Sequence, residues 1–291
     1  MYIRSFALTV CAYSFIKYTG AQEPIAGVVK TCNKPGVFAL TFDDGPSAYT
    51  PDLLRVLKEK NVTATFFVLG VQAAQSSLMA FLKQTFDAGH QIALHTNTHP
   101  HLDTLTQEAI KEEFTLNAQA VYNAIQVAPN YIRPPYGECS EPCQETIHKM
   151  GYSIINWNLD SNDWRYLEQP ENHTRILSNI VDEVKASNIN EQSFISLQHD
   201  TLEFSMKYVS DIIDAIKAKN YSFETVAECL NNQVPMYRGG GYDKPNSDNA
   251  DIPYRADSIV NTNSFRSSVE TNRFNIETFV AVMVIISFNL I

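Results

Sequence analysis

Two aspartates and two histidines stand directly after apolar segments of this chain and could together hold a divalent cation. Asp43 and Asp44 follow the apolar residues 37–42, and His95 and His99 follow a later apolar run. Two adjacent carboxylates are costly to desolvate unless a cation or a shared proton relieves their repulsion. Two imidazoles four residues apart suit one metal ion if that segment turns helically. With an oxygen of Asp44, the pattern predicts a His-His-carboxylate site that leaves positions open for water and substrate.

Zinc is the first choice of ion for this site, and cobalt or another first-row divalent ion is the alternative. Taken separately, Asp-Asp-Gly is also typical of a solvated turn, and histidines four residues apart also occur as structural pairs. The metal interpretation is favoured because polar clusters recur after later apolar segments.

Three more polar clusters follow apolar segments further along the chain. Arg133 stands before two prolines, which stiffen the backbone that carries its guanidinium. Residues 160–164 place carboxylates beside a tryptophan that could flank a sugar. His199 follows the apolar run 194–197, where a lone histidine is also typical of a satisfied core residue. Five such clusters in this order are hard to assign to structure alone.

These clusters fall at the ends of segments that are predicted to be strands. Short apolar runs alternate with amphipathic stretches between about residues 37 and 230. Strands are predicted over residues 37–42, 63–69, 91–95, 152–157 and 194–197, with a short one before Arg133. Helices are predicted over residues 51–60, 78–88, 106–126, 144–150, 172–187 and 206–219. Repeated strand–helix units indicate an α/β fold with a parallel sheet, and their number suggests a complete or incomplete barrel.

The composition narrows the range of partners. The 291 residues have room for one sizeable domain with tails, and 44% of them are hydrophobic. The chain carries 22 Lys and Arg against 32 Asp and Glu, a net charge of −10, which argues against nucleic acid as a partner. An acidic protein is compatible with a neutral polymer or with a substrate that becomes cationic as it reacts.

Both ends of the chain are typical of targeting segments. Residues 1–21 combine one arginine, an apolar stretch and a small-residue stop, which indicates a secretory signal peptide. Residues 279–291 form an apolar run too short to span a bilayer comfortably as a helix. With the polar spacer and small residues before it, this run predicts a GPI-attachment signal over residues 267–291. A short membrane anchor is the alternative.

The targeting segments and the composition also predict the domain boundaries. Residues 22–232 are predicted to form the folded domain. Residues 233–266, rich in Gly, Pro, Asn, Asp and Ser, are predicted to be a flexible tether. The protein is therefore expected to be secreted and held at the cell surface or wall, with membrane contact only through its anchor.

Secretion predicts that the cysteines are paired. Four cysteines remain after the signal peptide, and they allow three connectivities. Pairing Cys139 with Cys143 and Cys32 with Cys229 is the simplest choice, because one pair shares a loop and the other joins the ends of the domain. A zinc site suits one close pair and two distant cysteines poorly. Three Asn-x-Ser/Thr sequons are candidate glycosylation sites: Asn61, Asn172 and Asn220.

In its five polar clusters the chain resembles the NodB-type polysaccharide deacetylases, carbohydrate esterase family four, and most closely the fungal chitin deacetylases. The matching motifs, in order, are Thr-Phe-Asp-Asp-Gly, His-Thr-Asn-Thr-His, Arg-Pro-Pro-Tyr-Gly, Asp-Ser-Asn-Asp-Trp and Leu-Gln-His-Asp. The resemblance covers about residues 36–230 and implies a distorted, incomplete (β/α) barrel with its active groove at the carboxyl ends of the strands. The cysteine positions also resemble those of secreted fungal members, which supports the pairing above.

The resemblance implies that Asp44, His95 and His99 are the metal ligands and that Asp43 is the general base. The chemistry of amide hydrolysis agrees, because a poor electrophile needs a Lewis acid on its oxygen and an activated water. Arg133 is expected to hold the carboxylate of Asp43 in place.

Five further residues receive roles in the same way. The backbone N–H of Tyr136 is expected to stabilise the oxyanion, and His199 is expected to protonate the leaving amine. By resemblance, Asp163 keeps the imidazole of His199 charged. Trp164 is expected to form a wall of the groove, and Leu197 is expected to line the pocket for the acetyl methyl group.

The sequence thus predicts a metal-dependent deacetylase that removes N-acetyl groups from N-acetylglucosamine residues of chitin or chito-oligosaccharides and remodels a cell wall, acting as a monomer. Two alternatives stay open. The first is a deacetylase of another acetylated polysaccharide. The second is a catalytically silent, wall-bound carbohydrate-binding or structural protein on the same scaffold.

Overall fold

All strands of the sheet pair in parallel in the computed structural model, which describes residues 23–238. In sheet order they are β1 (Val28–Val29), β7 (Ser153–Ile155), β6 (Tyr131–Ile132), β5 (Gln91–Leu94), β4 (Thr65–Val68), β3 (Thr41–Asp43), β9 (Phe194–His199), β2 (Val37–Ala39) and β10 (Ser222–Phe223); β8 (Leu159–Asp160) pairs with β9 off this path. Within the described residues no pairing joins β1 to β10, so the barrel is open, as predicted.

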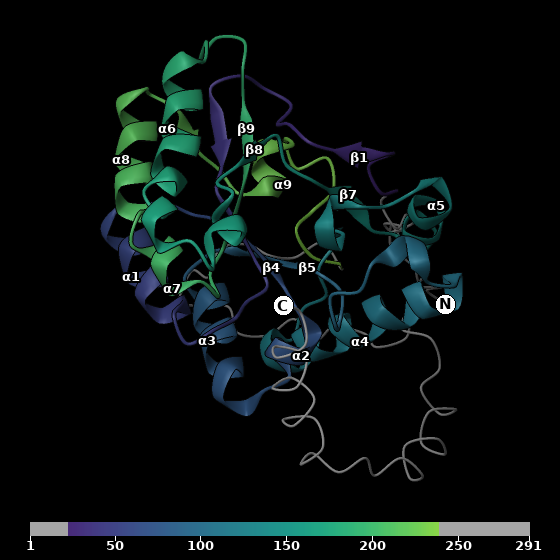
Figure 1. Ribbon diagram of the computed structural model, residues 1–291. Helices are drawn as coiled ribbons and strands as arrows, with labels where there is room; N and C mark the ends of the chain where they lie inside the picture. The colour runs from purple at the N-terminus through teal and green to yellow at the C-terminus, as the bar shows by residue number, and fades with distance from the viewer. Residues whose placement is uncertain (1–22, 239–291) are drawn as a thin grey trace, which may run out of the picture. The chain divides into compact units, whose positions relative to one another are not determined.

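The longer helices lie around the outside of the strands (Figure 1). They pack on one another in the order α6 (Arg175–Ala186), α8 (Val209–Ala218), α1 (Thr50–Glu59), α3 (Ser76–Asp87), α4 (Gln107–Ile125) and α5 (Glu141–Lys149). The shorter helices are α2 (Gly70–Ala73), α7 (Glu203–Met206) and α9 (Val226–Cys229). Four 3-10 turns complete the described elements: η1 (Leu102–Thr104), η2 (Pro135–Gly137), η3 (Asp163–Tyr166) and η4 (Pro170–Asn172).

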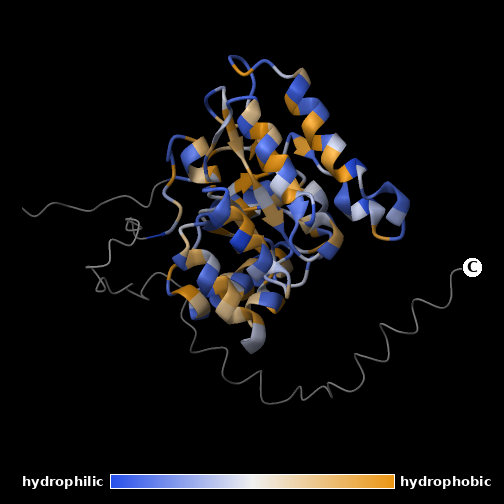
Figure 2. Cartoon of the chain, turned by 90° about the vertical axis from the view of Figure 1, so that its left-hand side faces the viewer, coloured by the Kyte–Doolittle hydropathy of each residue, from blue (hydrophilic) through white to orange (hydrophobic). Residues whose placement is uncertain are grey.

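Side chains alternate between two apolar layers along each strand, because successive residues of a strand point to opposite faces. Phe38, Leu40 and Phe42 belong to the outer layer, which also contains the buried faces of the surrounding helices. Val37 and Ala39 belong to the inner layer, which α9 helps to fill. Figure 2 shows orange and tan segments in the central strands, whereas the outer helices carry both blue and orange residues.

The elements that the sequence analysis missed are short. The run predicted as one strand over residues 37–42 is divided at Leu40 into β2 and β3, because only β3 continues the pairing to β4. The strands β1, β8 and β10 have two residues each, and the helices α2, α7 and α9 have four each. Elements of this length have no periodic signal that a sequence can display.

The packed chain extends further than predicted. Val234 and Tyr237 are buried, and the backbone N–H of Asn130 donates to the carbonyl oxygen of Met236 at 3.0 Å. Residues 233–238 therefore belong to the folded domain, and their assignment to a flexible tether was wrong. The remainder of the predicted tether lies outside the described residues.

Both predicted disulfides are formed, one between Cys32 and Cys229 and one between Cys139 and Cys143. The first closes a loop of 197 residues and joins the start of the domain to α9. It lies in the inner apolar layer. The second joins Cys139, in the loop that follows η2, to Cys143 in the first turn of α5.

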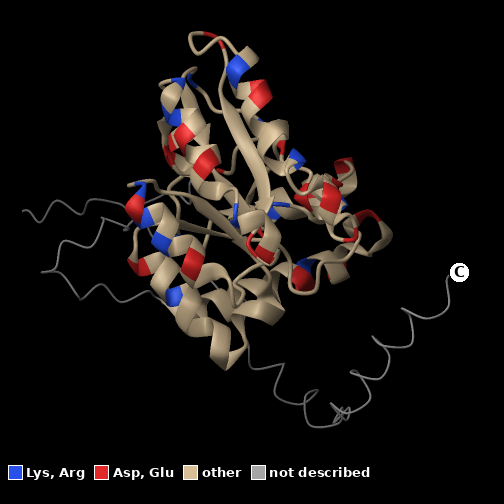
Figure 3. Cartoon of the chain, turned by 60° about the vertical axis from the view of Figure 1, so that its left-hand side comes forward, with Lys and Arg blue, Asp and Glu red and all other residues tan. Residues whose placement is uncertain are grey.

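Among residues 23–238, no helix is long and apolar enough to cross a membrane. The predicted signal peptide and the predicted GPI-attachment signal lie outside the described residues. Lys and Arg are interspersed with Asp and Glu over the helices in view (Figure 3).

Candidate active site

A cavity of about 450 Å³ opens at the carboxyl ends of the central strands and contains most of the residues predicted to act in chemistry. These residues meet because they end neighbouring parallel strands. Asp43 lies on the inner face of β3, and its register partner on β9 is His199. The lining residues are Asp43, Asp44, His95, His99, Tyr136, Glu138, Trp157, Trp164, Leu167, Leu197, His199, Thr201 and Leu202.

Asp44, His95 and His99 form a triangle of possible metal ligands. The Oδ1 atom of Asp44 is 3.5 Å from Nε2 of His95 and 3.6 Å from Nε2 of His99. This oxygen is buried and has no hydrogen-bond partner among the described residues. Bonds of about 2.1 Å to a tetrahedral ion separate two ligand atoms by about 3.4 Å, so these residues fit one divalent ion. The same donor set suits zinc and other first-row ions.

The segment that carries the two histidines is a loop and not the helical turn that their spacing predicted. Thr96 and His99 both have left-handed backbone conformations, with φ of 68° and 63°. Such conformations cost about 1–3 kcal/mol each for residues with a side chain. Two hydrogen bonds stabilise this shape: Oγ1 of Thr96 accepts from the N–H of His99 at 3.0 Å, and the N–H of Gly70 donates to the carbonyl oxygen of Thr96 at 3.0 Å.

His95 is held in the orientation and charge state that a metal ligand needs. Its Nδ1 atom lies 2.8 Å from the carbonyl oxygen of Arg133, which leaves Nε2 facing Asp44. Burial lowers the pKa of His95 to about 3, although the carboxylate of Asp44 opposes this shift. The imidazole is therefore neutral near pH 7, as metal binding requires.

Asp43 and Arg133 form a buried ion pair beside the triangle. Nη1 of Arg133 donates to Oδ1 of Asp43 at 2.7 Å and to Oγ1 of Thr41 at 2.7 Å. The guanidinium also lies over the ring of Phe67, 4.0 Å from its centroid. Burial raises the pKa of Asp43, and the charge of Arg133 opposes this rise. A fixed carboxylate with a raised pKa is suited to accept a proton.

His199 is paired with a second buried carboxylate. Its Nδ1 atom lies 2.7 Å from Oδ1 of Asp163, and its backbone N–H donates to Oδ2 at 2.8 Å. The hydroxyl of Ser205 donates to the same Oδ2 at 2.7 Å. Burial alone lowers the pKa of His199, but the contact with Asp163 outweighs burial and raises this pKa to about 10. The imidazole is thus held as a charged proton donor.

The remaining predicted site residues form the walls of the cavity. Tyr136 and Trp164 are 51% and 48% exposed, and Leu197 is buried at 3%. Tyr136 has a left-handed backbone with φ of 60°, and its ring stacks on that of His101 with 3.8 Å between centroids. Leu167, which the sequence analysis did not single out, is 56% exposed and also lines the cavity.

Two hydroxyl residues were also missed. Thr41 lies two residues before Asp43 and accepts from the same Arg133, and Ser205 lies 42 residues after Asp163. Serine and threonine are too common for a sequence to single them out without a local motif. The alternation of side chains along β3 was a usable signal for Thr41, because it shares a face with Asp43.

Asp160 and Asp200, which have no predicted role, stabilise the loops of the site. Oδ1 of Asp160 accepts from the N–H of Asn162 at 2.6 Å. Oδ2 of Asp200 accepts from the hydroxyl of Thr50 at 2.5 Å, and burial raises the pKa of Asp200 to about 7. A Cβ on Gly45 would lie 2.3 Å from Oδ1 of Asp200, so this loop position requires glycine.

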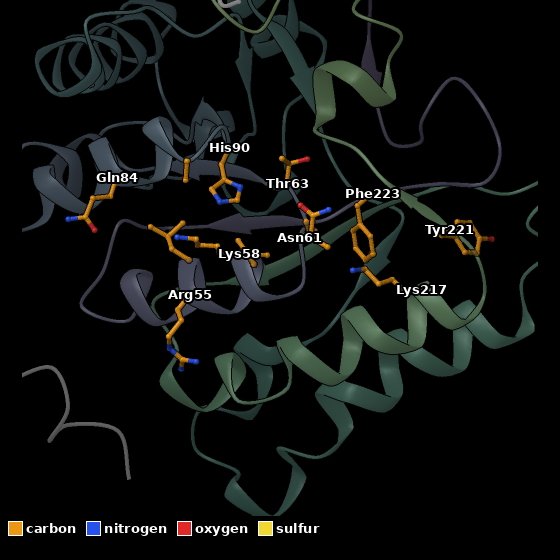
Figure 4. Close-up of a pocket in the computed structure, with 13 residues that line it drawn as sticks. Arg55, Lys58, Asn61, Thr63, Gln84, His90, Lys217, Tyr221 and Phe223 are labelled. Carbon is orange, nitrogen blue, oxygen red and sulfur yellow. The ribbon is translucent and has the colours of Figure 1, made fainter. Parts of the chain in front are cut away.

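A larger hollow of about 850 Å³ lies elsewhere, between α1, α3 and α8 (Figure 4). Its lining includes cationic and apolar side chains but no carboxylate and no thiol. The single histidine in the lining, His90, accepts a hydrogen bond at Nδ1 from the N–H of Ala64 at 3.1 Å. The hollow therefore lacks the groups that hydrolysis or metal binding would require.

The three sequons differ in their surroundings. Asn61 and Asn220 are exposed. Asn172 is half-buried, and its side-chain amide donates to Oε1 of Gln169 at 2.8 Å. Access for glycosylation is therefore better at the first two positions.

The chain matches known proteins over the region that contains this site. A family model described as polysaccharide deacetylase matches residues 30–155. A chitin deacetylase of Colletotrichum lindemuthianum is 34% identical over 213 residues, which make up 72% of this chain and 85% of that protein. A peptidoglycan-N-acetylglucosamine deacetylase of Bacillus cereus is 34% identical over 198 residues, which make up 65% of this chain and 66% of that protein.

Solved structures of deacetylases are also similar to this chain. The chitin deacetylase from Colletotrichum lindemuthianum superposes with a TM-score of 0.70 and 32% identity, covering 75% of this chain and 98% of that one. A family 4 carbohydrate esterase from Streptomyces lividans, in complex with acetate, has a TM-score of 0.57 and 31% identity. The match covers 67% of this chain and 93% of the esterase chain. The chain belongs to the polysaccharide deacetylase family. Within this family of enzymes it is similar to the fungal chitin deacetylases.

Replacement of Asp163 by Asn should lower the pKa of His199 by about 1–3 units, because a charge in direct contact with the imidazole is removed. NMR titration of His199 in the metal-free protein measures this shift. The raised pKa stabilises the fold fully below the unfolded value of 6.5 and loses this contribution as pH rises towards about 10. The Asp163→Asn variant should lack that alkaline loss of stability.

The matched control is Ser205→Ala, which removes one hydrogen bond to Asp163 and keeps its charge. This variant should shift the pKa of His199 less than Asp163→Asn does. An unchanged pKa in Asp163→Asn would show that Asp163 does not determine the charge of His199.

Proposed function

We propose that this polysaccharide deacetylase hydrolyses the N-acetyl groups of N-acetylglucosamine polymers with a divalent metal held by Asp44, His95 and His99. The observation that carries the proposal is the orphaned Oδ1 of Asp44, which lies within one ion's reach of both Nε2 atoms. Zinc is the first choice of ion, with cobalt or another first-row ion as alternatives. A bound cation would polarise the amide carbonyl and lower the pKa of water.

Asp43 is proposed as the general base. Its carboxylate removes the proton of the attacking water while a bond forms between the water oxygen and the amide carbon. Arg133 holds Oδ1 of Asp43 at 2.7 Å and so fixes where the proton is accepted. The backbone N–H of Tyr136 is proposed to donate to the oxyanion that develops on the former carbonyl oxygen.

His199 is proposed as the general acid. It donates a proton to the amide nitrogen as the carbon–nitrogen bond breaks, so the products are acetate and a free amine. Asp163 keeps the imidazole charged and oriented through its contact with Nδ1. Trp164 provides an exposed ring against which a sugar can pack, and Leu197 provides an apolar contact for the acetyl methyl group.

Chitin or chito-oligosaccharides are the proposed substrates, in remodelling of a cell wall. The similarity to the Colletotrichum chitin deacetylase supports this choice. Another acetylated polysaccharide is the second candidate, and it is supported by the 34% identity to the Bacillus peptidoglycan-N-acetylglucosamine deacetylase. Both candidates share the N-acetylglucosamine unit.

Purified protein loaded with zinc should release acetate from chito-oligosaccharides. A chelator should abolish this release, and added zinc should restore it, because no residue of the site replaces the cation as Lewis acid. The same assay on peptidoglycan fragments distinguishes the two substrate candidates. Bound zinc without acetate release from any acetylated polymer would contradict the proposal and favour a catalytically silent carbohydrate-binding protein.

The two adjacent carboxylates should respond differently to the same change. Asp43→Asn removes the base and keeps the ligands, so bound zinc should persist while turnover falls about 10²–10⁴-fold. Asp44→Asn replaces a charged ligand with a weaker neutral one, so excess zinc should partly restore its activity. Metal analysis and acetate release measure the two effects. Metal loss in Asp43→Asn with retention in Asp44→Asn would mean that the roles are reversed.

We also propose that the protein is a secreted monomer, glycosylated at Asn61 and Asn220 and anchored at the cell surface by GPI. The two disulfides support an oxidising compartment. A GPI-cleaving phospholipase should release the protein from intact cells. Retention after treatment would favour the alternative of a short membrane anchor.

A further inference from the structure

We infer that Glu113 and Asn117, one turn apart on α4, are positioning residues that fix the loop carrying His95 and His99. The inference rests on the metal site proposed above and adds two residues from outside the five motifs. Helix α4 packs against α2 and β5 (Figure 1), so it reaches the loop that leaves β5.

Glu113 holds the middle of this loop through three hydrogen bonds. Its Oε2 atom accepts from the backbone N–H groups of Asn97 and Thr98, each at 2.8 Å. Its Oε1 atom accepts from the hydroxyl of Thr98 at 2.7 Å. The side chain of Glu113 therefore fixes Asn97 and Thr98, two of the three residues between His95 and His99.

Asn117 holds the beginning of the same loop. Its side chain is fully buried, and its Oδ1 atom accepts from the backbone N–H of His95 at 3.0 Å. Its Nδ2 atom donates to the carbonyl oxygen of Val68 at 3.0 Å. Asn117 thus connects the end of β5 to the end of β4 at the point where His95 enters the cavity.

The loop needs such support because its backbone is not in a relaxed conformation. Thr96 and His99 are both left-handed, and such residues persist only where surrounding contacts determine them. Neither Glu113 nor Asn117 lines the cavity, so neither contacts the group that reacts there. Their effect on the metal must pass through the positions of His95 and His99.

The test compares zinc affinity in variants of the full folded chain, measured by competition with a chromogenic chelator. Glu113→Ala should raise the dissociation constant for zinc about 10–100-fold, as is typical when support of a metal ligand is lost. Glu113→Gln can keep all three hydrogen bonds if the hydroxyl of Thr98 reverses, so it should retain most of the affinity. The control is Glu112→Ala, since Glu112 is exposed on the same helix and its side chain makes no hydrogen bond or ion pair among the described residues.

A second measurement does not depend on metal. In the zinc-free protein, the amide hydrogens of Asn97 and Thr98 should exchange faster in Glu113→Ala than in the wild type or Glu112→Ala. If the wild type binds no zinc, the proposed function fails and the exchange rates alone decide about the positioning role. Equal exchange rates in Glu113→Ala and the wild type would then overturn the positioning role.

Turnover at saturating zinc distinguishes a residue that positions the metal ligands from one that takes part in the reaction. At saturating zinc, Glu113→Ala should recover most of its turnover, whereas Asp43→Asn should not. A dissociation constant for Glu113→Ala within twofold of the control, or a Glu113→Gln variant as weak as Glu113→Ala, would overturn the inference. The second result would mean that the charge of Glu113, and not its hydrogen bonds, matters.

Discussion

The buried ion pair between Arg133 and Asp43 is the interaction on which the mouth of the barrel depends. Arg133 is fully buried and Asp43 nearly so, and their contact at 2.7 Å joins the end of β6 to β3 across two intervening strands. Either charge alone in this place would be strongly unfavourable, and loss of one partner of a buried pair typically costs about 3–5 kcal/mol. Because the pair is obligatory, the carboxylate of Asp43 cannot turn away from the cavity. The constraint that stabilises the sheet therefore also fixes the proposed base.

The same cavity gives two histidines opposite properties. Burial dominates for His95, which has no carboxylate in hydrogen-bond contact, so its pKa falls to about 3. Contact with Asp163 dominates for His199, so its pKa rises to about 10. A cation beside Asp44 would lower the second value, because Oδ2 of Asp44 lies 3.9 Å from Nε2 of His199. Such different environments allow a single residue type to fill both proposed roles, His95 as a neutral metal ligand and His199 as a charged acid.

The sequence could predict the open barrel, and it could place most of the proposed catalytic residues around one cavity, because both features are encoded locally. Apolar strands followed at once by polar motifs place reactive side chains at one edge of a parallel sheet. Contacts between distant segments were beyond such reasoning: Ser205 reaches Asp163 across 42 residues, and Glu113 reaches the histidine loop from a helix with ordinary amphipathic spacing. Val234 and Tyr237 were misassigned for a related reason, since isolated apolar residues in a polar stretch do not reveal that a core is available to them.

The adjacency of Asp43 and Asp44 raises a geometric question, because neighbouring residues of a strand point to opposite faces. Phe42 faces the outer layer and Asp43 the cavity, so a continued strand would carry the next side chain outwards. Asp44 instead has φ of 74°, which ends the strand and brings its carboxylate back beside Asp43. Aspartate is among the few residues with a side chain that adopt this conformation readily. Two neighbouring carboxylates can thus enter one cavity, one fixed by Arg133 and the other left without a hydrogen bond at Oδ1 and available to a cation.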